Sequence, residues 1–306
     1  MFSALLTIAG LSVFEIVSSI DNAIINAEVL GTMGKRARRW FLTWGLFFAV
    51  FVARGLLPWL IVWATAPQLG PVGAFTAALS GNEALHALIE SAAPPLLVGG
   101  GTFLIFLFFH WIFLEPKNFG LARVERFFSS KGVWFYAIVS IILTVIVYEA
   151  LQFNPIVALG AVVGSTAFFI THGFKQNAEQ SEAKLLAKSG SMTDVSKLLF
   201  LEIIDLTFSI DGVLGAFAFT LSVPLILIGN GVGALVVRQL TMGNIEKIKQ
   251  YAYLKNGAMY SILALGTIML LDGFGVHIPA WVSPLVTAGC VGYFFVRSRR
   301  EIAAAR

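Results

Sequence analysis

The fold is decided by the stretch Glu15–Asn22 (EIVSSIDN), which places two carboxylates inside an apolar run of membrane length. A close copy, Asp205–Gly212 (DLTFSIDG), follows 190 residues later in a second apolar run. When the copies are aligned, the matching pairs are Glu15 with Asp205, Ser19 with Ser209, Ile20 with Ile210, and Asp21 with Asp211. A charged group at bilayer depth costs at least ~2.5 kcal/mol, so it rarely lies there without a task. The repeated acidic motif predicts an ion site built between two repeats.

The composition indicates a membrane protein. Of the 306 residues, 58% are hydrophobic and only 12% are charged, whereas a soluble domain has roughly 25% charged residues. The sequence therefore predicts one all-α polytopic transmembrane domain over residues 1–306. Nucleic-acid binding is not expected, because no basic patch interleaved with aromatic residues is present. The single Cys290 excludes an intramolecular disulfide.

Nine apolar segments approach the length of about 20 residues that a transmembrane helix needs. They are residues 3–28, 41–65, 95–114, 133–151, 154–173, 198–221, 223–242, 257–273 and 278–296. The proline-containing segment 67–94 is too polar and broken to cross, and its run 82–91 could form a short interfacial helix. Residues 175–197 are predicted to be the longest polar loop.

The positive charges predict the orientation of these spans. Lys and Arg gather in the loops after the first, third, fifth, seventh and ninth spans, and the other loops contain none. Because basic loops stay in the cytoplasm, the N-terminus is expected outside and the C-terminus inside. The two motifs then lie on helices of opposite direction. This arrangement predicts inverted repeats of about 1–114 and 198–296, with middle helices at 133–173.

The motifs resemble those of the TerC family of integral membrane proteins, within the LysE transporter superfamily. The resemblance rests on Glu15-x-x-Ser18-Ser19-x-Asp21-Asn22, on Glu202-x-x-Asp205-x-x-Phe208-x-x-Asp211-Gly212, on Asn230 before Arg238, and on Trp44-Gly45 with Arg54. Two positions depart from the family pattern, because Ser18 replaces a Leu and Gly212 replaces a Ser. The resemblance implies metal-ion efflux, chiefly of manganese.

The candidate ligands are hard oxygen donors, which suit Mn²⁺, Mg²⁺ or Ca²⁺. The predicted metal ligands are Glu15, Asp21, Asn22, Glu202, Asp205 and Asp211, and the supporting residues are Ser18, Ser19, Ser209, Asn230, Arg54 and Arg238. On a regular helix Asp21 and Asp211 lie about 120° away from the stripe of the other ligands. Either the helices break at the motif or each Asp reaches sideways. The arginines are expected to neutralise the carboxylates, and a purely structural ion-pair network is the alternative.

These observations predict a secondary transporter in the cell membrane that exports a divalent cation, with Mn²⁺ favoured. No nucleotide-binding motif is present, so an ion gradient, such as that of protons, would supply the energy. The expected partners are the cation and the lipid bilayer, without a permanent cofactor, and oligomerisation stays open. The alternatives are an intramembrane hydrolase with an Asp21/Asp211 dyad and a non-transporting membrane scaffold. His110 and His172 could relay protons or ligate metal, although lone histidines in apolar helices usually only hydrogen-bond.

Overall fold

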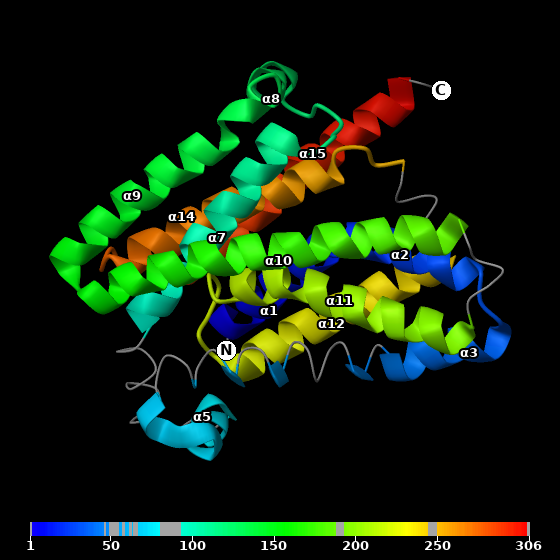
Figure 1. Cartoon of the computed structure of the whole chain (residues 1–306), viewed down its shortest axis with the longest axis horizontal. Helices are drawn as coiled ribbons and strands as arrows, with labels where there is room; N and C mark the ends of the chain where they lie inside the picture. Colours follow the sequence, from blue (N-terminus) through cyan, green and yellow to red (C-terminus); the bar gives the residue numbers. More distant parts are fainter. Residues whose placement is uncertain are drawn as a thin grey trace.

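Every regular element that the structure describes is a helix (Figure 1). The computed structural model describes residues 2–45, 67–79, 93–187, 193–243 and 250–304, together with 47–48, 55–56, 59–60 and 63. The helices of the first half are α1 (Phe2–Ser18), α2 (Ile20–Gly31), α3 (Lys35–Trp40), η1 (Phe41–Gly45), η3 (Pro67–Leu69), α5 (Gly70–Leu79) and α7 (Ala93–Leu114). Those that follow are α8 (Ala122–Ser129), η4 (Gly132–Trp134), α9 (Phe135–Phe153), α10 (Pro155–Ala187), α11 (Asp194–Ala216), α12 (Val223–Gly243), α14 (Leu254–Gly273) and α15 (Val282–Ala304).

Helix α7 is the central helix of one part of the molecule. It is buried along nearly its whole length, and it packs against α10 and α14. Its aromatic side chains meet those of α10, as in the perpendicular contact between Phe103 and Phe168 at 5.9 Å. A helix that is apolar all round belongs in such an interior position. The end of α7 is capped by Lys117, whose ammonium donates to the carbonyl oxygen of Ile112 at 2.9 Å.

Glycines allow α7 to approach both neighbours closely. A Cβ at Gly164 of α10 would overlap the backbone of Gly99, and a Cβ at Gly101 would lie 2.8 Å from the carbonyl oxygen of Gly266 in α14. Small residues at such contacts are the usual means by which membrane helices associate. Neighbouring glycines of α7 therefore serve two different interfaces.

The motif-bearing helices α1, α2 and α11 pack with α12 in the other part of the molecule, where they lie beside α10 in Figure 1. Leu11 of α1 packs against Gly229 of α12, and Glu15 of α1 packs against Gly233 of α12. Since both residue numbers rise together, α1 and α12 run in the same direction. The absence of a side chain at Gly229 and Gly233 therefore lets α1 and α12 pack closely at these two positions.

Four described helices are long and apolar enough to cross a membrane, namely Ala93–Leu114, Gly132–Phe153, Pro155–Asn177 and Leu254–Gly273. The pair Phe2–Ser18 and Asn22–Gly31, bent by 54°, makes a fifth if it forms one span. The sequence predicted nine. Two of the missing spans have a physical cause, because α11 carries five charged residues and α15 ends in an arginine-rich turn. In α12, the described apolar stretch Val223–Gln239 is shorter than a full span. The predicted span 41–65 lies mostly outside the described residues.

The prediction of a polar loop at 175–197 is wrong for its first part, because α10 continues to Ala187. Lys, Gln, Glu and Ala in this segment are good helix formers, so the helix outlasts its apolar portion. The predicted interfacial helix at 82–91 lies outside the described residues.

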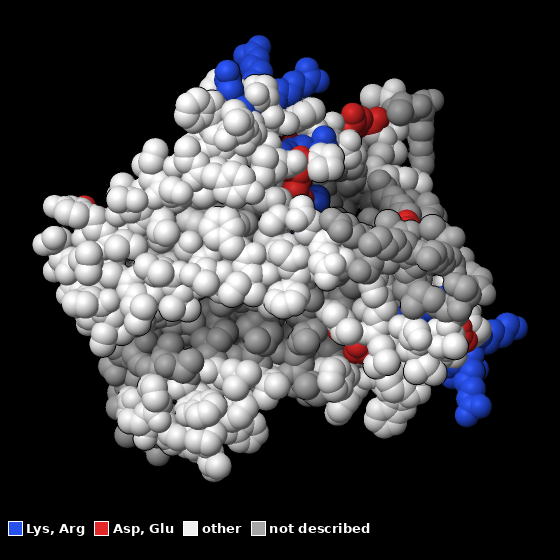
Figure 2. All heavy atoms as spheres, viewed as in Figure 1, with Lys and Arg blue, Asp and Glu red and all other residues white. Residues whose placement is uncertain are grey.

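The distribution of charge on the surface fits a membrane protein. Figure 2 shows Lys and Arg gathered over α8 and beside α3, whereas the described surface over α9 has neither. Large apolar side chains of α9 and α10 are exposed, including Ile141, Leu151 and Phe169. Bilayer lipid would cover such a surface. The chain is therefore a multi-helix protein with several membrane-length apolar helices.

Candidate functional site

The first acidic motif lies at a break between two helices. Helix α1 ends at Ser18, α2 begins at Ile20, and the intervening Ser19 has φ −90° and ψ 3°. Ser19 Oγ donates to Glu15 Oε1 at 2.7 Å, and Ser18 Oγ donates to the carbonyl oxygen of Glu15 at 3.3 Å. Serine hydroxyls that compete for backbone and side-chain acceptors are a recognised cause of helix bends. Of the two alternatives left open by the sequence, a broken helix holds for this copy.

The second motif lies within the continuous helix α11, beside the first. Asn22 Nδ2 donates to Asp205 Oδ1 across the interface between α2 and α11. A Cβ at Gly212 would lie 3.1 Å from Glu15 Oε2. The residue numbers change in opposite senses between these two contacts, so the chain segments that carry the motifs are antiparallel.

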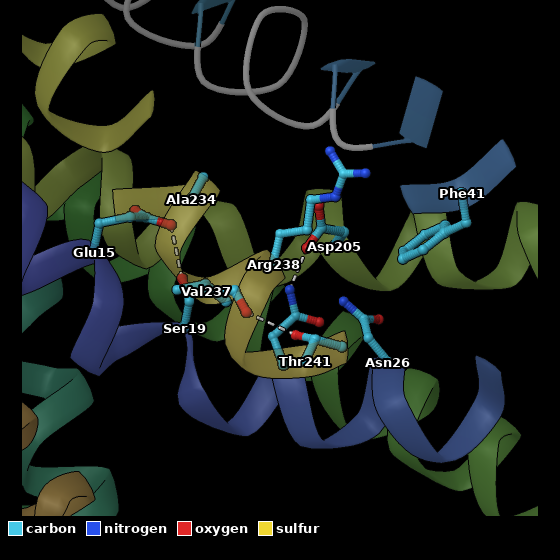
Figure 3. Close-up of a pocket in the computed structure, with 10 residues that line it drawn as sticks. Glu15, Ser19, Asn26, Phe41, Asp205, Ala234, Val237, Arg238 and Thr241 are labelled. Carbon is cyan, nitrogen blue, oxygen red and sulfur yellow. Dashed lines mark hydrogen bonds between the residues drawn. The ribbon is translucent and has the colours of Figure 1, made fainter. Parts of the chain in front are cut away.

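A small cavity opens between α1, α2, α11 and α12 (Figure 3). Its volume is about 50 Å³, compared with the ~10–15 Å³ that a single water needs. The cavity brings together three of the predicted metal ligands, Glu15, Asn22 and Asp205, with the supporting residues Ser19 and Arg238. We refer to it as the amide cavity.

The amide cavity holds oxygen atoms that lack a hydrogen-bond donor. Asn22 Oδ1 and Asn26 Oδ1 are both buried and have no donor among the described residues. Burying such a group without a partner costs several kcal/mol in an apolar medium, so these oxygens are poised to meet a ligand. Sequence reasoning missed Asn26, although Glu15, Ser19, Asn22 and Asn26 follow a helical spacing of i, i+4, i+7 and i+11 that could have revealed it.

Helix α12 supplies the remaining wall of the amide cavity. Arg238 and Thr241, one turn apart, line it together with Ala234. Figure 3 shows the side chain of Arg238 beside that of Asp205. Arg238 Nε is buried and has no acceptor within the described part of the chain. Asn230 is fully buried on the same helix, and its amide likewise makes no hydrogen bond there.

The other predicted ligands lie elsewhere. Glu202 lines a groove between α3 and α11 with Arg36 and Asp194, and its Oε1 is close to Gly45. Asp211 and Ser18 line a separate cavity, which we refer to as the charged cavity. The side chains of Asp21 and Ser209, and all of Arg54, lie outside the described residues. Across the described side chains, no three or more His, Cys, Asp or Glu residues are close enough to hold a metal ion together.

The charged cavity contains groups that the motif did not predict. Glu115 from the end of α7, Lys175 from α10 and Lys255 from α14 line it with Asp211. Lys255 Nζ lies 3.0 Å from Glu115 Oε2. Burial alone would raise the pKa of Glu115, but His110 and the positive charges of Lys255 and Lys175 outweigh it and hold that pKa well below its usual range. This carboxyl is therefore ionised.

Comparison with known proteins gives one match. No curated protein and no solved structure matches the chain. The model of the DUF475 family matches residues 20–303, which include the whole second motif and the last three residues of the first. The match spans far more than half of the sequence, and the chain therefore belongs to DUF475, a family of proteins of unknown function.

Proposed function

We propose that the protein is a secondary transporter that exports a divalent cation, with Mn²⁺ as the favoured substrate, and that the cation binds in the amide cavity. One observation carries this proposal. Glu15 and Asp205, from the two motif copies, line one small cavity together with Asn22 and Asn26, whose buried amide oxygens have no donor among the described residues.

The donor set supports a hard divalent cation. Glu15 and Asp205 together would offset a charge of +2, which the surrounding apolar helices cannot solvate. Carboxylate and amide oxygens are the ligands that Mn²⁺, Mg²⁺ and Ca²⁺ accept, whereas a soft ion would favour thiolates. Asp21 remains a proposed ligand only because it belongs to the sequence motif, since its side chain lies outside the described residues. Asp211 is left out of this cavity because it lines the charged cavity.

The cross-contacts of the two motifs support an inverted repeat. In the alignment, Glu15 corresponds to Asp205 and Asn22 corresponds to Gly212. A two-fold axis between the repeats would therefore turn the contact of Asn22 with Asp205 into that of Gly212 with Glu15. Both contacts are present, as an isologous arrangement requires. Transporters built from inverted repeats bind their substrate at such an interface.

The arginine Arg238 would balance the carboxylates when no cation is bound. The likeness of the motifs to the TerC family supports the same activity. The asymmetry of the basic loops supports a cell-membrane protein with its N-terminus outside and its C-terminus inside.

The test is direct binding of Mn²⁺ to the purified, detergent-solubilised chain by titration calorimetry, followed by Mn²⁺ flux in proteoliposomes. We expect saturable binding that Glu15→Gln weakens at least tenfold, or about 1.4 kcal/mol. Glu28→Gln is a matched control, because Glu28 is exposed and lies on the neighbouring helix α2.

Three outcomes separate the candidate functions. Binding with flux supports transport. Binding without flux under any gradient would contradict transport and favour a membrane scaffold that holds metal. Absence of binding for Mn²⁺, Mg²⁺ and Ca²⁺ would contradict the proposal altogether.

A further inference from the structure

Glu115, which lines the charged cavity, belongs to a chain of ionisable groups drawn from separate helices. His110 Nδ1 of α7 lies 3.3 Å from Glu115 Oε1, and Lys255 Nζ of α14 lies 3.0 Å from Glu115 Oε2. Glu115 thus has a different cationic or cationisable partner at each oxygen. His110 is 7% exposed, so a proton on its ring would be shielded from solvent.

A second histidine completes this group. The ring of His172 from α10 lies with its centroid 3.9 Å from that of His110. The edges of Phe135 and Phe168 close the apolar side of His110, with centroids at 5.5 Å and 6.1 Å. Two imidazole rings in contact can pass a proton from one to the other. The negative charge of a carboxylate beside one ring can hold the proton there.

The helix break joins this group to the amide cavity. Ser18 lines the charged cavity, and its neighbour Ser19 donates to Glu15 in the amide cavity. On α11, Asp205 lines one cavity and Asp211 lines the other. A change in the angle between α1 and α2 would therefore alter both cavities at once.

We propose that His110, held by Glu115 and backed by His172, is the proton-binding site whose loading is coupled to cation binding through the α1–α2 break. The inference rests on the proposed transport function and names its coupling ion. When the cation enters the amide cavity, His110 releases its proton, and re-protonation accompanies cation release.

Ionisable groups from four helices lie at this site or beside it. His110 meets Glu115 at the end of α7 and His172 on α10. Glu115 in turn lines the charged cavity with Lys175 on α10, Asp211 on α11 and Lys255 on α14. Figure 2 shows acidic and basic side chains together in a recess between α8 and α10.

The experiment measures proton release on Mn²⁺ addition to the purified, weakly buffered protein, using a pH-indicator dye alongside calorimetric Mn²⁺ binding. Wild type should release protons in proportion to bound Mn²⁺. His110→Gln should reduce this release at least fivefold while the Mn²⁺ affinity at alkaline pH changes less than threefold. In proteoliposomes, the same variant should lose pH-gradient-driven Mn²⁺ accumulation but keep Mn²⁺/Mn²⁺ exchange. His277→Gln is the matched control, since His277 is exposed outside the helices.

The outcomes separate this inference from the proposed function. Mn²⁺ binding by wild type without proton release, or with release that His110→Gln leaves unchanged, overturns the proton site and leaves cation transport standing. Absence of Mn²⁺ binding overturns both. His172→Gln provides a second variant if His110→Gln does not fold, and it should lower the rate of proton release while the amount released stays near that of wild type.

Discussion

The two motif copies are nearly alike in sequence but differ in local structure. The copy at Glu15–Asn22 is divided between α1 and α2 by a 54° bend, whereas the copy at Asp205–Gly212 lies inside the unbroken α11. The sequences differ where the bend occurs, because the first copy has Ser18 before Ser19 and the second has Phe208 before Ser209. Paired serine hydroxyls offer the backbone alternative hydrogen bonds, which a phenylalanine does not.

The difference teaches how one repeated motif can serve two cavities. At the break, adjacent serines face different cavities, so one short segment belongs to both. On the continuous helix α11, the two residues that line different cavities, Asp205 and Asp211, are separated by nearly two helical turns. Because only one of the two motif copies is bent, the two copies are not structurally equivalent.

The largest expected effect distinguishes the two aspartates of α11. Asp205→Asn should weaken Mn²⁺ binding at least a hundredfold, or about 2.7 kcal/mol, because an amide cannot offset the charge of the cation. Asp211→Asn should change the affinity less than tenfold, since Asp211 lines the charged cavity. Calorimetry on both variants, with folding checked by gel filtration, makes the measurement. Equal losses in the two variants would show that both aspartates bind the cation.

The next effect concerns the stability that the charged cavity provides. Glu115→Gln should lower stability by about 2 kcal/mol at neutral pH, less than the ~3–5 kcal/mol of a fully buried pair, because Lys255 is 36% exposed. The pKa of Glu115 is depressed in the folded state, so the stabilisation is present above the unfolded pKa of about 4.5 and is lost as the pH falls below it. Thermal unfolding between pH 7 and pH 3 should therefore show a steeper acid decline for wild type than for Glu115→Gln. Parallel declines would show that the Glu115 carboxyl does not cause the loss of stability at acid pH.

A smaller effect is expected at the amide that joins the motifs. Asn22→Ala removes the donor to Asp205, and hydrogen bonds between membrane helices contribute ~0.6–2 kcal/mol. The variant should unfold at a correspondingly lower temperature and should also bind Mn²⁺ more weakly, because Asn22 Oδ1 is lost. Added Mn²⁺ should raise the melting temperature of wild type more than that of the variant. An unchanged Mn²⁺ shift would remove Asn22 from the ligand set.

The sequence was sufficient to predict much of the helical framework. The predicted spans 95–114, 133–151 and 257–273 match α7, α9 and α14 closely, because the length of an apolar run and its flanking turn residues are local properties. The end of α10 was missed for the opposite reason. Its polar extension has no hydrophobic signal, although its residues favour a helix.

The cavities depend on tertiary packing, which the sequence specifies only in part. The motif alignment predicted that Glu15, Asn22 and Asp205 would meet, and they line one cavity. It could not reveal that Lys255 would reach Glu115, since these residues lie 140 positions apart and neither belongs to a motif. Asp211 was assigned to the same cavity as Asp205 because the motif contains both. Their separation follows from the way in which α11 passes between two sets of neighbours.

The smallest expected effect tests the position where the second copy lacks a side chain. A Cβ at Gly212 would lie 3.1 Å from Glu15 Oε2, so Gly212→Ala must displace that carboxylate by a few tenths of an ångström. We expect Mn²⁺ affinity to fall about threefold, or ~0.7 kcal/mol. Thermal stability should not fall, because Ala is favoured over Gly inside a helix by ~1 kcal/mol. Gly289→Ala in α15 is the matched control, since a Cβ there meets no atom within 4 Å, and it should leave Mn²⁺ affinity unchanged. A loss of stability in Gly212→Ala without a loss of affinity would mean that Gly212 matters only for packing and that the two motif copies do not share one cation.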